Sequence, residues 1–162
     1  TFHLDFYNHS DIETILNRNA KILNMTINPD ASMLVAERSR RTPRIANRLL
    51  KRVRDFSEVK HDGLVNKKIA SEALAMLSID ELGLDETDRR LLQTLIEKFN
   101  GGPAGLNTLA AAISEEMDTI ETIYEPFLLQ LGFLERTPRG RKATPAAYTH
   151  LGYDVPKNQT LL

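Results

Sequence analysis

Apolar side chains recur at every third or fourth position through the first half of the chain, which is the spacing of one face of an α-helix. Two start signals support this pattern: Ser10 forms a capping box with Glu13, and Thr42 precedes Pro43 at the first position of a helix. Residues 1 to about 78 therefore predict a small helical bundle. Its helices are expected from about Asp11 to Asn24, from the turn at Asn28–Asp30 to about Arg38, from Pro43 to the stop at Lys60–Gly63, and over about Ile69 to Leu77.

The second half of the chain predicts three helices followed by a β-hairpin. An acidic stretch, Ile79–Glu86, opens this unit. The strand pattern Phe133–Thr137, the turn Pro138–Gly140 and a return through Lys142–Thr144 mark the hairpin. The helices before the hairpin are expected at about Leu91–Phe99, Leu106–Ile113 and Asp118–Leu131, and a last short helix is expected from the cap at Thr144 through Tyr148.

Three helices followed by a hairpin with a basic tip are typical of a winged helix-turn-helix domain. The predicted fold class is therefore mostly α: a small helical bundle over residues 1–78, then a winged helix-turn-helix domain with a short β-hairpin over residues 79–152. Residues 153–162 have little apolar surface to bury, so they predict a loose C-terminal tail.

Composition narrows the classes of protein that the chain can belong to. Apolar residues make up 41% of its 162 residues and charged residues 27%, which is enough for a core of ordinary size. We find no leader and no apolar run of the ~20 residues that a bilayer requires, so the prediction is a cytoplasmic protein. Cysteine is absent and the four histidines are widely spaced, so neither a metal site nor thiol chemistry is expected. A metabolic enzyme is disfavoured because no nucleophile and base are paired.

The net charge of −1 conceals a strong segregation of charge along the chain. Eight basic residues and no acidic one lie between Arg38 and Arg54, whereas Asp80–Asp88 holds five acids and no base. Near the C-terminus four basic residues are accompanied by Glu135 alone. Local charge decides what a surface binds, so nucleic acid remains a candidate partner despite the net charge.

Three motif-bearing stretches cover nearly the whole chain. The first is Arg41–Leu50 with Arg52–Phe56. The second begins at Gly101-Gly102-Pro103, includes Thr108–Ala112 and ends at Tyr124-Glu125-Pro126. The third holds Gly132-Phe133-Leu134, Arg136–Arg141 and Ala143-Thr144. In their order and spacing these stretches resemble the RuvB family of Holliday-junction branch-migration ATPases, whose second-sensor helix is similar to the first stretch.

The resemblance implies the lid and the winged-helix domain of a AAA+ motor. Members of the family work as homohexameric rings that drive branch migration at four-way DNA junctions in recombination and repair, together with RuvA and RuvC. We expect this chain to follow an ATPase core, since it has no G-x-x-x-x-G-K-[ST] motif and no acidic metal-holding strand. ATP or ADP and Mg²⁺ would bind mainly in that core, so this chain alone is expected to lack catalytic residues and ATP hydrolysis.

Two residues are nucleotide-binding candidates through the resemblance. Arg44 is the arginine of the Thr-Pro-Arg motif, which in the family reaches the nucleotide phosphates, and a guanidinium can grip phosphate oxygens in two places. Tyr7 would contact the adenosine side. From pattern alone, a solvated basic face is the commoner role for Arg44, and packing in the core is the commoner role for Tyr7; the motif match reverses the preference for Arg44. Arg41 stands where the family usually has glycine, which would alter the turn if that position requires a positive φ.

The third helix of the second unit would ordinarily read the major groove of DNA, but its charge argues against that role here. Glu115, Glu116, Asp118, Glu121 and Glu125 lie along it or just before it without a single base, so phosphates would repel it. Met117 also replaces an arginine found in some relatives.

The hairpin is left as the predicted DNA-binding element. Arg136 and Arg141 correspond to the family's DNA-contacting arginines, and Arg139 is a further candidate between them. With few arginines and no aromatic platform, contact with the DNA backbone or minor groove is expected, independent of base sequence. An ordinary solvated hairpin is the alternative from charge alone. The alternative for the whole chain is a non-enzymatic DNA-binding or regulatory module whose basic helix, from Pro43 onward, is the DNA surface.

Overall fold

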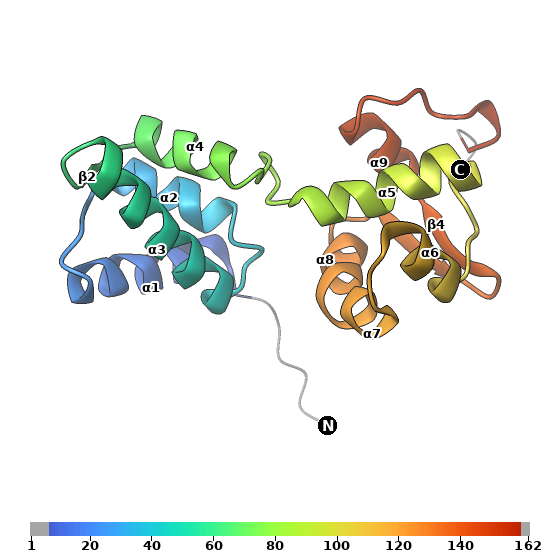
Figure 1. Ribbon diagram of the computed structural model, residues 1–162, viewed down its shortest axis with the longest axis horizontal. Helices are drawn as coiled ribbons and strands as arrows, with labels where there is room; N and C mark the ends of the chain where they lie inside the picture. The colour runs from blue at the N-terminus through green and yellow to red at the C-terminus, as the bar shows by residue number, and fades with distance from the viewer. Residues whose placement is uncertain (1–6, 160–162) are drawn as a thin grey trace. The chain divides into compact units, whose positions relative to one another are not determined.

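The computed structural model describes residues 7–159 and divides the chain into two compact units, between Asp85 and Glu86 (Figure 1). The mostly helical fold with one antiparallel hairpin confirms the predicted fold class. We describe each unit by itself.

Within residues 7–85 the first unit is a bundle of four helices. These are α1 (His9–Ile22), α2 (Pro29–Glu37), α3 (Pro43–Lys60) and α4 (Lys67–Met76). Their apolar faces share one core, in which the fully buried large side chains are Ile12, Leu16, Leu50 and Leu74. Two short strands, β1 (Thr26–Ile27) and β2 (Leu64–Val65), pair in parallel and tie the loops after α1 and α3 together.

The start of α1 differs from the predicted capping box. Asn8 is the N-cap, and its side-chain oxygen accepts a hydrogen bond from the backbone N–H of Asp11 at 2.8 Å. Ser10 lies inside the first turn and donates its hydroxyl to the same Asn8 oxygen at 2.6 Å. The capping box was wrong because the sequence offers two capping residues two positions apart, and the earlier one reaches the free N–H.

The loop before α3 adopts a left-handed backbone at two consecutive arginines, Arg40 (φ 57°) and Arg41 (φ 53°). Arg40 is buried; its guanidinium lies 3.4 Å from the carboxylate of Asp85 and donates to the carbonyl of Gly83 at 3.2 Å. Arg41 donates from Nε to the carbonyl of Tyr7 at 2.6 Å. The position where the family usually has glycine thus does take a positive φ, and an arginine side chain is accommodated there by a hydrogen bond.

The backbone at Arg41 gives a direct test of this turn. Arg41→Gly should leave the protein about 1 kcal/mol more stable than Arg41→Ala, because both variants lose the guanidinium but only alanine keeps a Cβ at positive φ. Urea unfolding of the two variants, followed by far-UV circular dichroism, measures the difference. Equal stabilities would show that the turn does not hold this position in the left-handed region.

The second unit begins with α5 (Glu86–Phe99) and α6 (Leu106–Ile113). The third helical segment is continuous in space but mixed in type: α7 (Met117–Thr119), a π-helical turn η1 (Ile120–Tyr124) and α8 (Glu125–Gln130). Strands β3 (Leu134–Thr137) and β4 (Gly140–Ala143) form an antiparallel hairpin in which Arg136 lies opposite Arg141. Ala104, in the loop between α5 and α6, pairs with Arg141 through two backbone hydrogen bonds. The hairpin is thereby fixed to the body of the unit.

The chain after the hairpin returns to α5. The α9 helix (Pro145–His150) is capped by the hydroxyl of Thr144, as predicted. The hydroxyl of Tyr153 donates to the carboxylate of Glu97 on α5, and this hydrogen bond, with a smaller effect of burial, raises the pKa of Tyr153. A short 3-10 turn, η2 (Lys157–Gln159), ends the described part of the chain. The start of the predicted tail is therefore attached to the unit, and residues 160–162 lie outside the described range.

Candidate functional site

The β3–β4 hairpin, residues Leu134–Ala143, is the wing, and its turn is closed by its own side chains. Thr137 donates its hydroxyl to the carbonyl of Gly140 at 2.8 Å, and the N–H of Arg139 donates to the Thr137 hydroxyl at 3.3 Å. The side chain of Arg139 is exposed at this turn and has no partner within residues 7–159. A positive charge therefore stands free at the tip of the wing.

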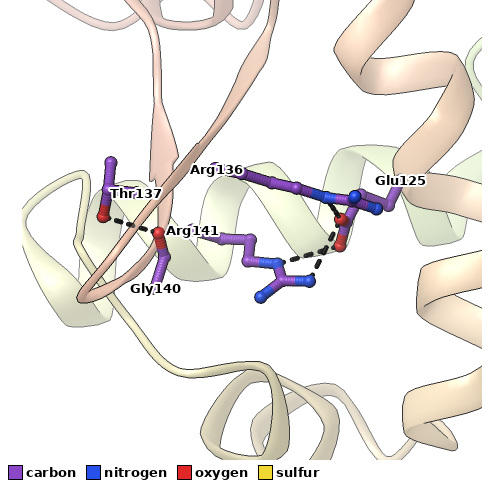
Figure 2. Close-up of polar contacts among 5 residues, drawn as sticks. All are labelled: Glu125, Arg136, Thr137, Gly140 and Arg141. Atoms are coloured by element: carbon purple, nitrogen blue, oxygen red, sulfur yellow. Dashed lines mark hydrogen bonds and ion pairs between the residues drawn. The ribbon is translucent and has the colours of Figure 1, made fainter.

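The two other candidate arginines of the wing share one carboxylate, that of Glu125 on α8 (Figure 2). Arg136 donates from Nε to Oε1 of Glu125. Arg141 donates from Nε to Oε2 at 3.0 Å and from Nη2 to Oε1 at 3.1 Å. The side chain of Glu125 is 0% exposed, whereas Arg141 is 18% and Arg136 is 51% exposed. Like charges directly opposite each other on paired strands repel, and the carboxylate placed against both offsets that repulsion.

The π-helical turn explains why Glu125 is buried. In a regular α-helix, two residues five positions apart point about 140° away from each other. A π turn adds a residue to the turn, so the side chains of Ile120 and Glu125 share the buried face, with 1% and 0% exposed. Pro126 follows directly and has no N–H to donate, which makes the regular helical ladder impossible to complete at this point.

This geometry corrects two parts of the sequence interpretation. Glu125 does not belong to the exposed acidic face of the third helix, which keeps Glu116, Asp118 and Glu121. Glu135 is also not the only acid beside the wing arginines, since Glu125 is bonded to two of them. The available signal was the dipeptide Glu125-Pro126, because a proline inside a helical pattern marks a break or bulge.

Arg44 lies exposed in the first turn of α3. Thr42, the N-cap residue, does not cap the helix with its side chain, because its hydroxyl donates to the carbonyl of Arg40 at 3.0 Å. The first N–H groups of an 18-residue helix and a guanidinium without a partner among residues 7–159 are therefore presented together. Such an arrangement suits a phosphate group, since helix N-termini and guanidinium groups both donate to anions.

Tyr7 lies beside the same loop. Its carbonyl accepts the hydrogen bond from Arg41, three residues before Arg44, and its side chain is 49% exposed. An exposed ring is not part of the core, so it is accessible to a ligand. The residues that the sequence put forward for nucleotide therefore belong to adjoining segments of the first unit, and they fit a phosphate with a neighbouring aromatic group.

The other basic residues on and just before α3 fall into two groups, those bonded to a partner and those exposed without one. Arg38 donates to the carbonyl of Ile79 at 3.4 Å, and Arg54 pairs with Asp55 at 3.0 Å. The basic residues of α3 that are exposed and have no partner in the described range are Arg44, Arg48, Lys51, Arg52 and Lys60. Lys51 also borders a shallow groove with Asn19, Ile22, Leu23 and Asn47.

Among residues 7–159, acidic and histidine side chains nowhere gather in a group of three or more that could hold a metal ion. No helix in that same range is sufficiently long and apolar to cross a membrane.

Comparison with known proteins assigns each of the two units to a protein family. Residues 7–80 match the RuvB AAA lid domain, and residues 81–152 match the RuvB C-terminal winged helix domain. The Holliday junction branch migration complex subunit RuvB of Chloroflexus aggregans is 58% identical over 154 residues, which cover 95% of this chain and 44% of that protein. The protein of the same name from Chloroflexus aurantiacus gives the same identity and coverage.

Solved structures give the same result. A Thermotoga maritima RuvB mutant superposes with a TM-score of 0.91 at 49% identity, covering 95% of this chain and 51% of that one. The Thermotoga maritima RuvB Holliday junction branch migration motor superposes with a TM-score of 0.90 at 50% identity, covering 94% and 51%. The chain thus spans about half the length of the relatives it matches.

The fold and its exposed basic groups define a AAA+ lid bundle followed by a winged-helix domain. The chain belongs to the RuvB family, which confirms the resemblance found in the sequence.

Proposed function

We propose that this chain is the nucleotide-sensing lid and the DNA-gripping winged helix of an ATP-dependent Holliday junction branch-migration motor. The observation that carries the proposal is the match of both units, in order, to RuvB proteins whose names state Holliday junction branch migration. An ATPase core, which the longer relatives have room for, would bind ATP with Mg²⁺ and hydrolyse it. RuvA, RuvC and five further copies of the motor would be its partners in the cytoplasm, on DNA under recombination or repair.

The nucleotide role falls to Arg44, with Tyr7 beside it. The free guanidinium and the uncapped start of α3 support contact with the phosphates, and the exposed ring of Tyr7 supports contact with the adenosine side. Loss of the terminal phosphate would remove an anion to which Arg44 can donate, so the position of the lid would change with the nucleotide state. This coupling would convert hydrolysis into movement of the winged helix.

The DNA role falls to the wing. Arg139 is exposed at its tip and has no partner among residues 7–159, and half of the Arg136 side chain is exposed although its Nε is bonded to Glu125. Arg141 lies opposite Arg136 on the paired strand and is less exposed, at 18%. The wing, residues 134–143, carries guanidinium groups and no aromatic side chain that could stack on bases, which favours contact with phosphates. Such contacts carry no sequence information. A motor that passes along any DNA requires such contacts.

A salt series tests the wing as the DNA grip. Binding of the chain to a labelled four-way junction and to a plain duplex should be sensitive to salt and independent of sequence, and Arg139→Ala should weaken both several-fold. Loss of one phosphate contact should also reduce the slope of log affinity against log salt by about 0.9. Arg136→Ala should act in the same direction, since Arg141 still pairs with Glu125 in that variant.

The matched control is Arg48→Ala, which removes an exposed arginine without a described partner from α3. It should leave affinity and slope unchanged. The second candidate function, a DNA-binding module that uses α3 itself, is favoured by the five exposed basic residues of that helix that have no partner within residues 7–159. It predicts the reverse pattern, in which Arg48→Ala weakens binding and Arg139→Ala does not, and that result would contradict our assignment of the wing.

A further inference from the structure

Glu125 is the most deeply buried acid in contact with the wing, and its bonds leave part of each arginine unused. Arg136 donates to Glu125 from Nε alone, so its two terminal nitrogens make no bond within residues 7–159. Arg141 uses Nε and Nη2, which leaves Nη1. Figure 2 shows both guanidinium groups gathered at the one carboxylate. The N–H groups that remain available thus belong to Arg136 and Arg141, and Glu125 holds both of these side chains in place.

We propose that Glu125 is a positioning residue, which holds Arg136 and Arg141 together as one binding unit for a single DNA phosphate. This inference rests on the proposed DNA role of the wing. Without Glu125, two guanidinium groups on directly paired strand positions would repel each other and turn apart. With it, both are bonded and ordered before DNA arrives, so less side-chain freedom is lost on binding.

An account based on net charge alone predicts that Glu125 weakens DNA binding instead of strengthening it. The carboxylate and two guanidinium groups together carry one positive charge, and removal of the carboxylate would raise that to two. If charge alone governed binding, Glu125 would compete with phosphate and weaken the grip. Because the two accounts differ in sign, a single substitution separates them.

The substitution is Glu125→Gln, which keeps the size of the side chain and removes its charge. The amide can accept from one arginine, but its NH₂ group faces donors, so the pair loosens. We expect affinity for a duplex to fall about tenfold and the salt slope to lose about 0.9, despite the added net positive charge. The control is Glu121→Gln, an exposed acid on the same helical segment that pairs with no described residue, which should leave affinity unchanged or slightly raised.

The outcomes separate this inference from the proposed function. If Glu125→Gln binds DNA as tightly as the unchanged chain or more tightly, while Arg139→Ala and Arg136→Ala weaken binding, the positioning role is wrong and the wing assignment stands. If neither arginine variant changes affinity or slope, the wing is not the DNA surface and the proposed function fails first.

A measurement on the unchanged chain keeps the inference testable if Glu125→Gln does not fold. Arginine Nε–Hε resonances held by a buried carboxylate should be dispersed and slow to exchange in NMR spectra. We expect those of Arg136 and Arg141 to stay so when a short duplex is added, because Glu125 keeps its bonds while the terminal nitrogens take the phosphate. If both resonances lose their dispersion and exchange rapidly with water when DNA is added, the arginines leave Glu125 in order to bind DNA. That result would overturn the positioning role.

Discussion

Gly140→Ala is expected to destabilise the winged-helix unit by about 3 kcal/mol or more. Gly140 has a φ of +132°, and a Cβ added there would lie 2.4 Å from the carbonyl oxygen and 2.5 Å from the carbonyl carbon of Ala104. Both atoms belong to the backbone that pairs with Arg141, so they cannot move away without breaking that pairing. Strain and steric overlap therefore add, and the wing would separate from the loop before α6.

Gly132→Ala is the control for this substitution. Gly132 also has a positive φ, +71°, but an added Cβ would have no atom within 4 Å. It should cost about 1 kcal/mol, the strain of an alanine in the left-handed region alone. Urea unfolding followed by tyrosine emission measures both variants, because three of the four tyrosines lie in the second unit. Equal losses for the two variants would show that the contact with Ala104 does not constrain the wing.

Arg141→Ala should destabilise the same unit by about 3 kcal/mol. It removes two of the three hydrogen bonds to the buried carboxylate of Glu125, which is left with Arg136 alone. It also removes a side chain that is only 18% exposed. The control is Arg139→Ala, two residues before Arg141 in the turn of the wing. Arg139 is exposed and has no partner in residues 7–159, so this change should alter stability by less than about 0.5 kcal/mol. If Arg141→Ala has only a small effect on stability, burial of the Glu125 carboxylate does not depend on its ion pair with Arg141.

This stability cost bears on how the wing is tested. A loss of DNA binding in Arg141→Ala would combine the loss of a contact with a loosened hairpin. Arg139 and Arg136 are therefore the better positions for measurements of affinity, since their removal leaves Arg141 paired with Glu125.

The lid bundle could be predicted from the sequence because its helices are long and amphipathic. Pro43 begins α3 as predicted, and the buried face of the helix carries Leu49 and Val53. The predicted cap was wrong in one respect, because the hydroxyl of Thr42 bonds to the carbonyl of Arg40 instead of capping the helix. The parallel pair of β1 and β2 was not predicted, since two residues in each strand are too few for any periodicity to show. The capping error at Ser10 arose in the same way, from a local choice between neighbouring polar residues.

The candidate site was predictable in part. The exposed positions of Arg44 and Arg139 agree with the roles that their motifs suggest, although those roles stay predictions. The bond of Glu125 to the wing was missed because a helical spacing of 3.6 residues puts position 125 on the exposed face with Glu121, and the π turn that brings it to the buried face was signalled in the sequence only by Pro126. A charged residue that looks solvated in the sequence is in fact buried between the helix and the hairpin.

The measurement that tests the central claim most directly is an amide NMR map of the chain, recorded with a short duplex and then with ATP. Our account predicts that DNA shifts the backbone amides of Arg136, Arg139 and Arg141 and leaves α3 unaffected. ATP in large excess, needed because the core that would hold most of it is not part of this chain, shifts the backbone amides of Arg44 and Ala46 at the start of α3. Shifts by DNA along α3, around Arg48 and Lys51, with an unperturbed wing would contradict the account and make the lid's basic helix the DNA surface.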